Sequence, residues 1–207
     1  MTFSSISLSE IPEKSVILIE EEIGSVERVF LHQILSEAVS SGKKALYLAV
    51  HSGKEDIVNE IKQYGFLDYE HAGEESLKIE GYFNDLADIS DIARDYDLCI
   101  IDPFPFLVMH KEDSYIVEFL GALKKLSRKE DIRFFLSMDA GVSKKSTESI
   151  ARAIADGIIQ FREISNGRKI ERYANIPKMK GKLPPAEMIP ILLTESGITI
   201  DTRQAIR

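Results

Sequence analysis

The sequence predicts an α/β fold in which helices flank a mostly parallel sheet and antiparallel hairpins extend its C-terminal edge. Short continuous apolar runs, typical of strands buried on both faces, alternate with amphipathic segments along most of the chain. From residue 157 onward, turn residues separate strand-like pieces without intervening helices. The length of 207 residues suits one domain, and we find no internal repeat or linker, so we expect a single domain over residues 1–207.

Each element of this fold has its own signal in the sequence. Apolar runs predict parallel strands at 16–19, 45–50, 98–101 and 134–136. Apolar residues at helical spacing predict helices at 25–38, 57–64, 84–93, 114–123 and 147–155. Strand-like pieces at 157–164, 169–176, 189–193 and 198–200 complete the pattern. Asn166-Gly167 predicts a two-residue hairpin turn, and Glu195–Gly197 predicts a second turn.

Composition and charge narrow the class of protein. The chain is 44% hydrophobic and 29% charged, which is typical of a globular protein, and no apolar run approaches the roughly 20 residues that span a bilayer. The N-terminus lacks the basic start and apolar stretch of a secretory signal. The single cysteine, Cys99, lies in an apolar run, which favours a buried thiol in a reducing cytoplasm. The formal net charge of −8 argues against general nucleic-acid binding.

Ligands in such sheets bind beyond the carboxyl ends of the parallel strands, where helix N-termini offer free N–H groups to anions. Three predicted strand ends therefore matter: Glu20–Arg28, His51–Gly53 and Asp102-Pro103.

Several segments resemble the archaeal KaiC-like ATPases of the RecA superfamily. The strand at 11–19 and the helix after it resemble the elements around that family's P-loop, and 45–57 resembles the next strand and helix. Residues 96–102 look like the Walker B strand, while 155–159, 177–181 and 195–198 match further motifs in the same order. The resemblance spans nearly the whole chain and implies a RecA-like three-layer fold. It would also imply ATP and magnesium as cofactors if the phosphate-binding residues were kept.

The phosphate-binding residues of the resembling family are replaced. Its P-loop runs Gly, four residues, Gly, Lys, then Ser or Thr, where the glycines let backbone N–H groups surround phosphates and the lysine neutralises their charge. The aligned positions here hold Glu21, Val26, Glu27 and Arg28, and only the internal Gly24 remains. Exchanging attraction for repulsion matters because one charge pair 4 Å apart is worth roughly 4 kcal/mol at an effective dielectric of 20. We therefore expect no nucleotide cofactor and no catalytic residue.

The other two strand ends show a similar loss. The resemblance places a pair of glutamates that activate water where this chain has His51 and Ser52. Asp102 remains at the Walker B position, where we expect a structural role. His51 and Asp102 together are too few for a typical metal centre, so we expect no metal.

Two further features bear on partners. Lys178 and Lys180 resemble a basic pair that in the KaiC-like family reaches the nucleotide of the adjacent subunit, so they are candidates for a trans-acting role, the alternative being a solvated basic face. Residues 104–109 after Asp102 are expected to form an apolar loop that packs in the core or under a helix; any that are exposed would form a patch for a partner protein.

These observations favour a non-catalytic KaiC/RecA-like protein with a regulatory or assembly role, acting through association with itself or with an active KaiC-like ATPase. One alternative is an ATPase with an atypical P-loop that binds ATP and magnesium and uses Arg28 and His51. A second is a DNA recombination or repair accessory, in which Lys178 and Lys180 would contact DNA. We expect no membrane association, with homo-oligomerisation as one form of partnership.

Overall fold

The computed structural model describes residues 6–22, 24, 26–86 and 88–203. Its strands form one nine-stranded sheet in the order β3-β2-β4-β5-β1-β6-β7-β8-β9. The strands are β1 Val16–Glu21, β2 Ala45–Ala49, β3 Leu77–Glu80, β4 Leu98–Asp102, β5 Arg133–Asp139, β6 Gly157–Asn166, β7 Lys169–Met179, β8 Ile189–Thr194 and β9 Gly197–Ile200. Pairings from β3 through β6 are parallel, and those from β6 to β9 are antiparallel. The predicted α/β class is confirmed.

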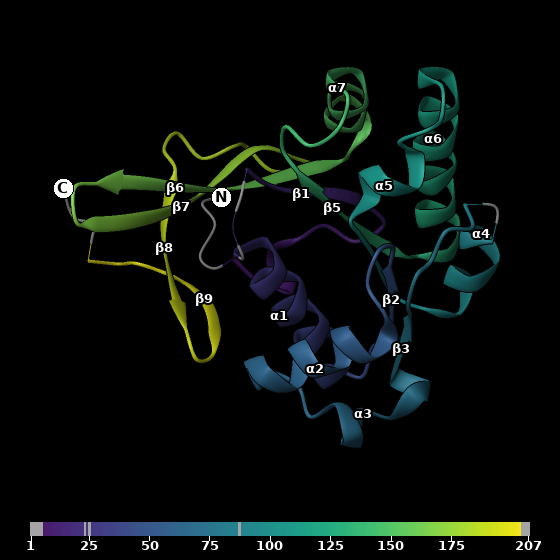
Figure 1. Cartoon of the computed structure of the whole chain (residues 1–207), viewed down its shortest axis with the longest axis horizontal. Helices are drawn as coiled ribbons and strands as arrows, with labels where there is room; N and C mark the ends of the chain where they lie inside the picture. The colour runs from purple at the N-terminus through teal and green to yellow at the C-terminus, as the bar shows by residue number, and fades with distance from the viewer. Residues whose placement is uncertain (1–5, 23, 25, 87, 204–207) are drawn as a thin grey trace.

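Helices cover both faces of the parallel part of the sheet, and α1 and α2 lie on the side opposite α6 and α7 (Figure 1). The α-helices are α1 Val26–Ser40, α2 Lys54–Tyr64, α3 Tyr69–Ser76, α4 Ile89–Ile92, α5 Phe104–Val108, α6 Asp113–Glu130 and α7 Lys145–Ile154, and the 3-10 helices are η1 Leu8–Glu10 and η2 Ala93–Asp95. Within the described residues no helix is both long enough and apolar enough to cross a membrane.

The sheet separates two apolar cores because successive strand residues point to opposite faces. In β1, Ile17 and Ile19 belong to the core under α1 and α2, whereas Val16 and Leu18 belong to the core under α4–α7. Cys99 lies in the second core, where burial raises the pKa of its thiol. The predicted buried thiol is therefore present.

Most predicted elements are found, with shifted ends. The helix expected after Asn84 instead begins at Ile89, with Asp88 as its N-cap residue, and Asn84 and Asp85 have no regular structure. The hairpin turn lies one residue later than predicted, since Asn166 pairs with Lys169 and leaves Gly167 and Arg168 as the turn. Strand β3 and helices α3 and α5 were not predicted. The apolar run after Asp102, expected to be a loop, forms α5.

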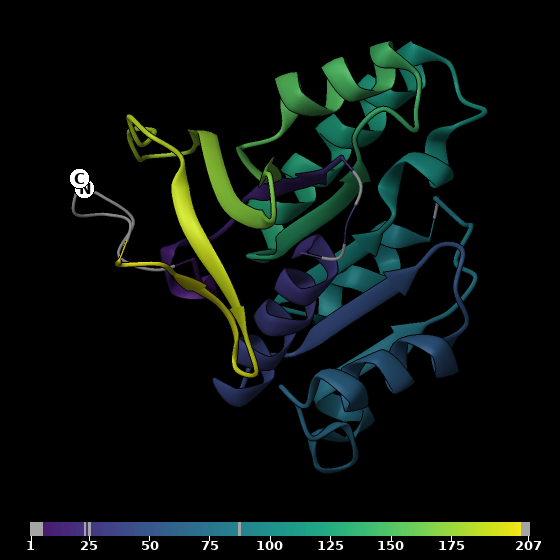
Figure 2. The same ribbon diagram turned by 60° about the vertical axis from the view of Figure 1, so that its left-hand side comes forward.

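The edge of the antiparallel extension is covered by a side chain. β8 and β9 lie beside α1 (Figure 2), and the backbone N–H of Ile198 donates to Oε1 of Gln33 in α1 at 2.7 Å. Gly197 has φ 104°, and a Cβ there would lie 2.6 Å from the same oxygen, so glycine allows this approach. The contact satisfies a donor that an edge strand would otherwise offer to another chain.

Candidate functional site

The candidate site lies where β1, β4 and β5 end, on the face of the sheet covered by α1. The alternation that sends Ile17 and Ile19 toward α1 sends Glu21 the same way. Asp102 of β4 and Asp139 of β5 share this face, and both lie near enough to Arg28 of α1 for its charge to act on them. Three strand ends therefore bring their acids to the start of one helix.

Glu21 fills the N-terminal end of α1. Its two carboxylate oxygens accept the backbone N–H of Val26 at 3.4 Å and that of Glu27 at 2.9 Å. A Cβ on Gly24 would lie 2.2 Å from Oε1 of Glu21, so the carboxylate packs directly against the one retained glycine. Burial raises the pKa of Glu21, and the two backbone hydrogen bonds oppose that shift. The helix end that cradles phosphate in a P-loop protein holds the chain's own carboxylate instead.

Glu27 adds a buried acid at the position of the P-loop lysine. Its side chain is buried, and its Oε2 has no hydrogen-bond partner among the described residues. Burial, followed by the charges of Asp102 and Asp139, raises its pKa well above the ordinary value, while a hydrogen bond with Ser137 opposes the shift. We call Glu21, Glu27, Asp102 and Asp139 the carboxylate cluster. A further anion entering this cluster would be repelled.

Asp102 is fully engaged by the protein. Its carboxylate accepts hydrogen bonds from the hydroxyls of Tyr47 and Ser137, and Nη2 of Arg28 lies 3.6 Å from Oδ2. Burial and the charge of Asp102 raise the pKa of Tyr47, which keeps this phenol a neutral donor. The structural role expected for Asp102 therefore has a physical basis.

Arg28 balances part of the acidic charge. Its Nη1 donates to both carboxylate oxygens of Glu60 in α2, at 3.0 and 3.2 Å, and the same carboxylate lies 3.3 Å from Nε2 of His32. Burial lowers the pKa of Arg28, but the charge of Asp102, together with the charge of Glu60 and the hydrogen bond to it, raises that pKa by more. A guanidinium thus gives Asp102 the positive charge that a Walker B acid receives from magnesium.

These residues do not fit a magnesium–nucleotide complex. The N–H groups at the start of α1 already donate to Glu21. The acid Glu27 stands at the position that aligns with the P-loop lysine, and Asp102, at the Walker B position, is paired with Arg28. Within the described part of the chain, no group of three or more histidine, cysteine or acidic residues has the arrangement of a metal site.

His51 and Ser52 are held by residues outside the carboxylate cluster. The exposed ring of His51 packs against Phe106 with centroids 5.3 Å apart, and the Ser52 carbonyl accepts the Tyr82 N–H at 2.9 Å. His51 lies close enough to Asp139 to lower its pKa, although burial, the largest cause, and Asp102 raise that pKa by more. The two residues are positioned by packing and by the backbone.

Lys178 and Lys180 lie at the opposite end of β1 from Glu21. Lys178 donates to the carbonyls of Arg152 and Ala153 at 3.3 and 2.9 Å, and Lys180 donates to the carbonyl of Lys14 at 3.3 Å. Burial and the neighbouring Lys124 lower the pKa of Lys178. The pair is too remote to act on this chain's own α1 N-terminus.

The sequence reasoning did not single out Tyr47, Ser137, Asp139 or Glu60. For the first three a signal existed, because each shares the strand parity that directs Asp102 or Glu21 toward α1. Glu60 had no such signal, since nothing in the sequence says that α2 places it beside Arg28.

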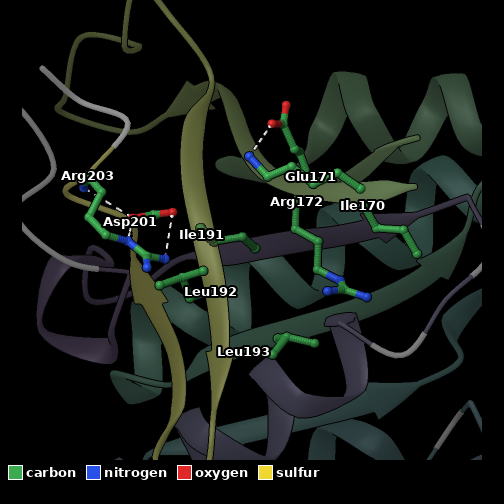
Figure 3. Close-up of a pocket in the computed structure, with 9 residues that line it drawn as sticks. Ile170, Glu171, Arg172, Ile191, Leu192, Leu193, Asp201 and Arg203 are labelled. Atoms are coloured by element: carbon green, nitrogen blue, oxygen red, sulfur yellow. Dashed lines mark hydrogen bonds and ion pairs between the residues drawn. The ribbon is translucent and has the colours of Figure 1, made fainter. Parts of the chain in front are cut away.

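A separate hollow of about 350 Å³ lies in the antiparallel extension (Figure 3). Its charged side chains are paired: Lys169 with Glu171 at 2.7 Å, Arg203 with Asp201 at 2.9 Å, and Arg172 with Glu163, which lies outside the hollow. Such pairing leaves it without a group poised for catalysis.

The hydrogen bonds that Glu21 accepts from the start of α1 lead to a prediction about stability. We expect Glu21→Ala to lower the free energy of unfolding by about 1–2 kcal/mol, because two helix N–H groups lose their acceptor. Urea denaturation measures this. The matched control is Glu22→Ala, which removes an exposed acid one residue later and is expected to change stability by less than about 0.5 kcal/mol. Equal effects of the two variants would show that Glu21 does not cap α1.

Comparison with known proteins supports the fold. No curated protein matches this chain. The structure is similar to that of a KaiC-like protein from the hyperthermophilic archaeon Pyrococcus horikoshii OT3, with a TM-score of 0.76 and 19% sequence identity, over 92% of this chain and 90% of that chain. The RecA/KaiC-like fold predicted from the sequence is confirmed. A model described as a family of unknown function, DUF7125, matches residues 10–207, and the chain therefore belongs to the DUF7125 family.

Proposed function

We propose that this protein is a non-catalytic KaiC/RecA-like domain that regulates or assembles with a protein partner, either a second copy or an active KaiC-like ATPase. The observation that carries the proposal is the Glu21 carboxylate, which accepts the first backbone N–H groups of α1. Nucleotide binding in a P-loop protein uses those N–H groups for phosphate. A carboxylate of the same chain is always present at its own site, so a phosphate would have to displace it.

The surrounding charges support the same conclusion. An entering γ-phosphate would meet Glu27 instead of a lysine, and magnesium would compete with Arg28 for Asp102. The alternative ATPase that uses Arg28 and His51 is disfavoured, because Arg28 is held by Glu60 and His51 packs on Phe106. The fold itself is intact, which leaves association as the role best suited to this domain.

Calorimetry and phosphate release with Mg-ATP test the proposal. We expect no binding tighter than a dissociation constant of about 1 mM and no phosphate release above the protein-free rate. A KaiC-like protein with an intact P-loop, assayed in parallel, is the positive control. Micromolar binding with turnover that is lost in Asp102→Asn would overturn the proposal, and turnover lost in Arg28→Ala would favour the atypical ATPase.

A further inference from the structure

The helix after Asp102 divides its apolar residues between the core and the surface. Phe104 and Val108 are fully buried, whereas Phe106 is 36% exposed and Met109, which follows α5, is 46% exposed. Val142, in the loop between β5 and α7, is 60% exposed. The exposed residues Phe106 and Met109 thus lie near Val142, an exposed apolar residue from a distant segment of the chain.

A hollow of about 240 Å³ lies between α5 and the start of α7. Phe106, Met109 and Val142 line it, together with Lys144 and Thr147. The volume suits one or two apolar side chains and is below the roughly 300–1,000 Å³ of a typical small-molecule pocket. It is the right size for a short segment of a partner.

The exposed Lys144 lines this hollow and the exposed Lys145 follows it at the start of α7, although the whole chain carries a formal charge of −8. Among the described residues, no carboxylate lies within ion-pair distance of Lys144 or Lys145. The acids nearby have other partners: Asp113 accepts the Ser146 hydroxyl at 3.0 Å, and Glu148 accepts the Gly141 N–H at 2.8 Å. The lysines are therefore available to an external carboxylate.

The N-terminus of α7 adds to the positive charge of these lysines. Lys144 occupies the N-cap position, and no side chain caps the helix there. Uncapped N–H groups and the helix dipole favour a carboxylate at the same place as the two lysines. The apolar residues that line the hollow and the lysines at the start of α7 together indicate the chemistry of a segment that would bind there.

We propose that this hollow, which we call the α5–α7 groove, binds a short segment of a partner protein that presents an apolar side chain beside an Asp or Glu. The apolar side chain enters between Phe106, Met109 and Val142, and the carboxylate pairs with Lys144 and Lys145. The proposal rests on the proposed function, to which it adds a surface and the chemistry of the partner. Binding is expected to be weak, in the micromolar range, because the groove is small.

Selection from a random peptide display library on the full-length protein tests the groove. We expect enriched peptides that combine an apolar anchor with Asp or Glu and that shift the NMR signals of residues 105–109 and 142–147. Affinity of the synthesised peptides, measured by fluorescence polarisation, is expected to fall about tenfold or more in Met109→Glu and in Lys144→Glu. The controls Leu183→Glu and Lys125→Glu change exposed residues elsewhere and are expected to leave affinity unchanged.

Four results would overturn the inference: no enrichment over the Met109→Glu protein as bait, enriched peptides without acidic residues, NMR shifts outside the groove, or affinity unchanged in both groove variants. Analytical sedimentation tests whether a second copy of this chain occupies the groove instead. A wild-type dimer that dissociates in Val142→Glu would show that it does. None of these results depends on Mg-ATP, so failure here is distinguishable from failure of the proposed function. Thermal melting of each variant shows whether it is folded.

Discussion

Asp102→Ala is expected to lower the free energy of unfolding by about 2–4 kcal/mol, because two buried hydroxyl groups lose their acceptor. The change leaves the hydroxyls of Tyr47 and Ser137 without their shared acceptor and removes one of the two carboxylates beside Arg28. Both hydroxyl-bearing residues are fully buried, so water cannot replace the lost bonds easily. Urea denaturation at pH 7 measures the loss.

This prediction separates a structural acid from one kept for a metal ion. An acid held ready for magnesium would repel its acidic neighbours, and removing it would stabilise the protein. The matched control is Asp139→Asn, in the same cluster, whose charge raises the pKa of Glu27 and which is expected to be neutral or stabilising. A double variant, Asp102→Asn with Arg28→Met, is expected to lose less than the sum of its single changes. Stabilisation by Asp102→Ala alone would contradict the structural role.

Glu27→Gln is expected to stabilise the protein at pH 8 and to flatten its dependence on pH. The pKa of Glu27 in the folded protein lies well above the ordinary value of 4.5, so the folded state holds this proton over a range where the unfolded state has lost it. Stability therefore falls as the pH rises from about 4.5 toward the folded pKa, by about 1.4 kcal/mol for each unit between the two values. Glutamine keeps the size of the side chain and has no proton to lose, so it stays neutral over the whole pH range.

Urea denaturation from pH 4.5 to 8.5 measures the effect. The control is Glu55→Gln, which removes an exposed acid at the start of α2 and is expected to leave the pH profile of the wild type. If Glu27→Gln and the wild type show the same profile, Glu27 is ionised in the folded protein and lies in a more polar setting than its burial indicates.

The parallel sheet was predictable because its strands are buried on both faces and are continuous in the sequence. Strand β3 was missed because its four residues alternate buried and half-buried, the pattern of an edge strand, and give little signal. Helix α5 was missed because five residues that include a proline do not establish helical periodicity.

The candidate site was only partly accessible from the sequence. Counting residues against the P-loop pattern identified Glu21, Glu27 and Arg28 as replacements, and that could be done without coordinates. Their partners could not be found in this way. Whether Glu21 points into the helix end or away from it depends on the loop between β1 and α1, and Arg28 meets Glu60 only because α2 packs beside α1. Side-chain pairing across elements depends on tertiary packing, which local sequence does not encode.

The contacts of Glu21 and Arg28 with their neighbours have a consequence for any attempt to build a nucleotide site into this chain. A lysine placed at position 27 alone would leave the carboxylate of Glu21 on the N–H groups of α1, and a glycine placed at position 21 alone would leave those N–H groups beside the acid of Glu27. Replacing Arg28 alone would leave Asp102 with less positive charge nearby. None of these changes alone gives free N–H groups, a lysine at position 27 and an unpaired Asp102 together. A nucleotide site at this helix end would need several of these positions to change at once.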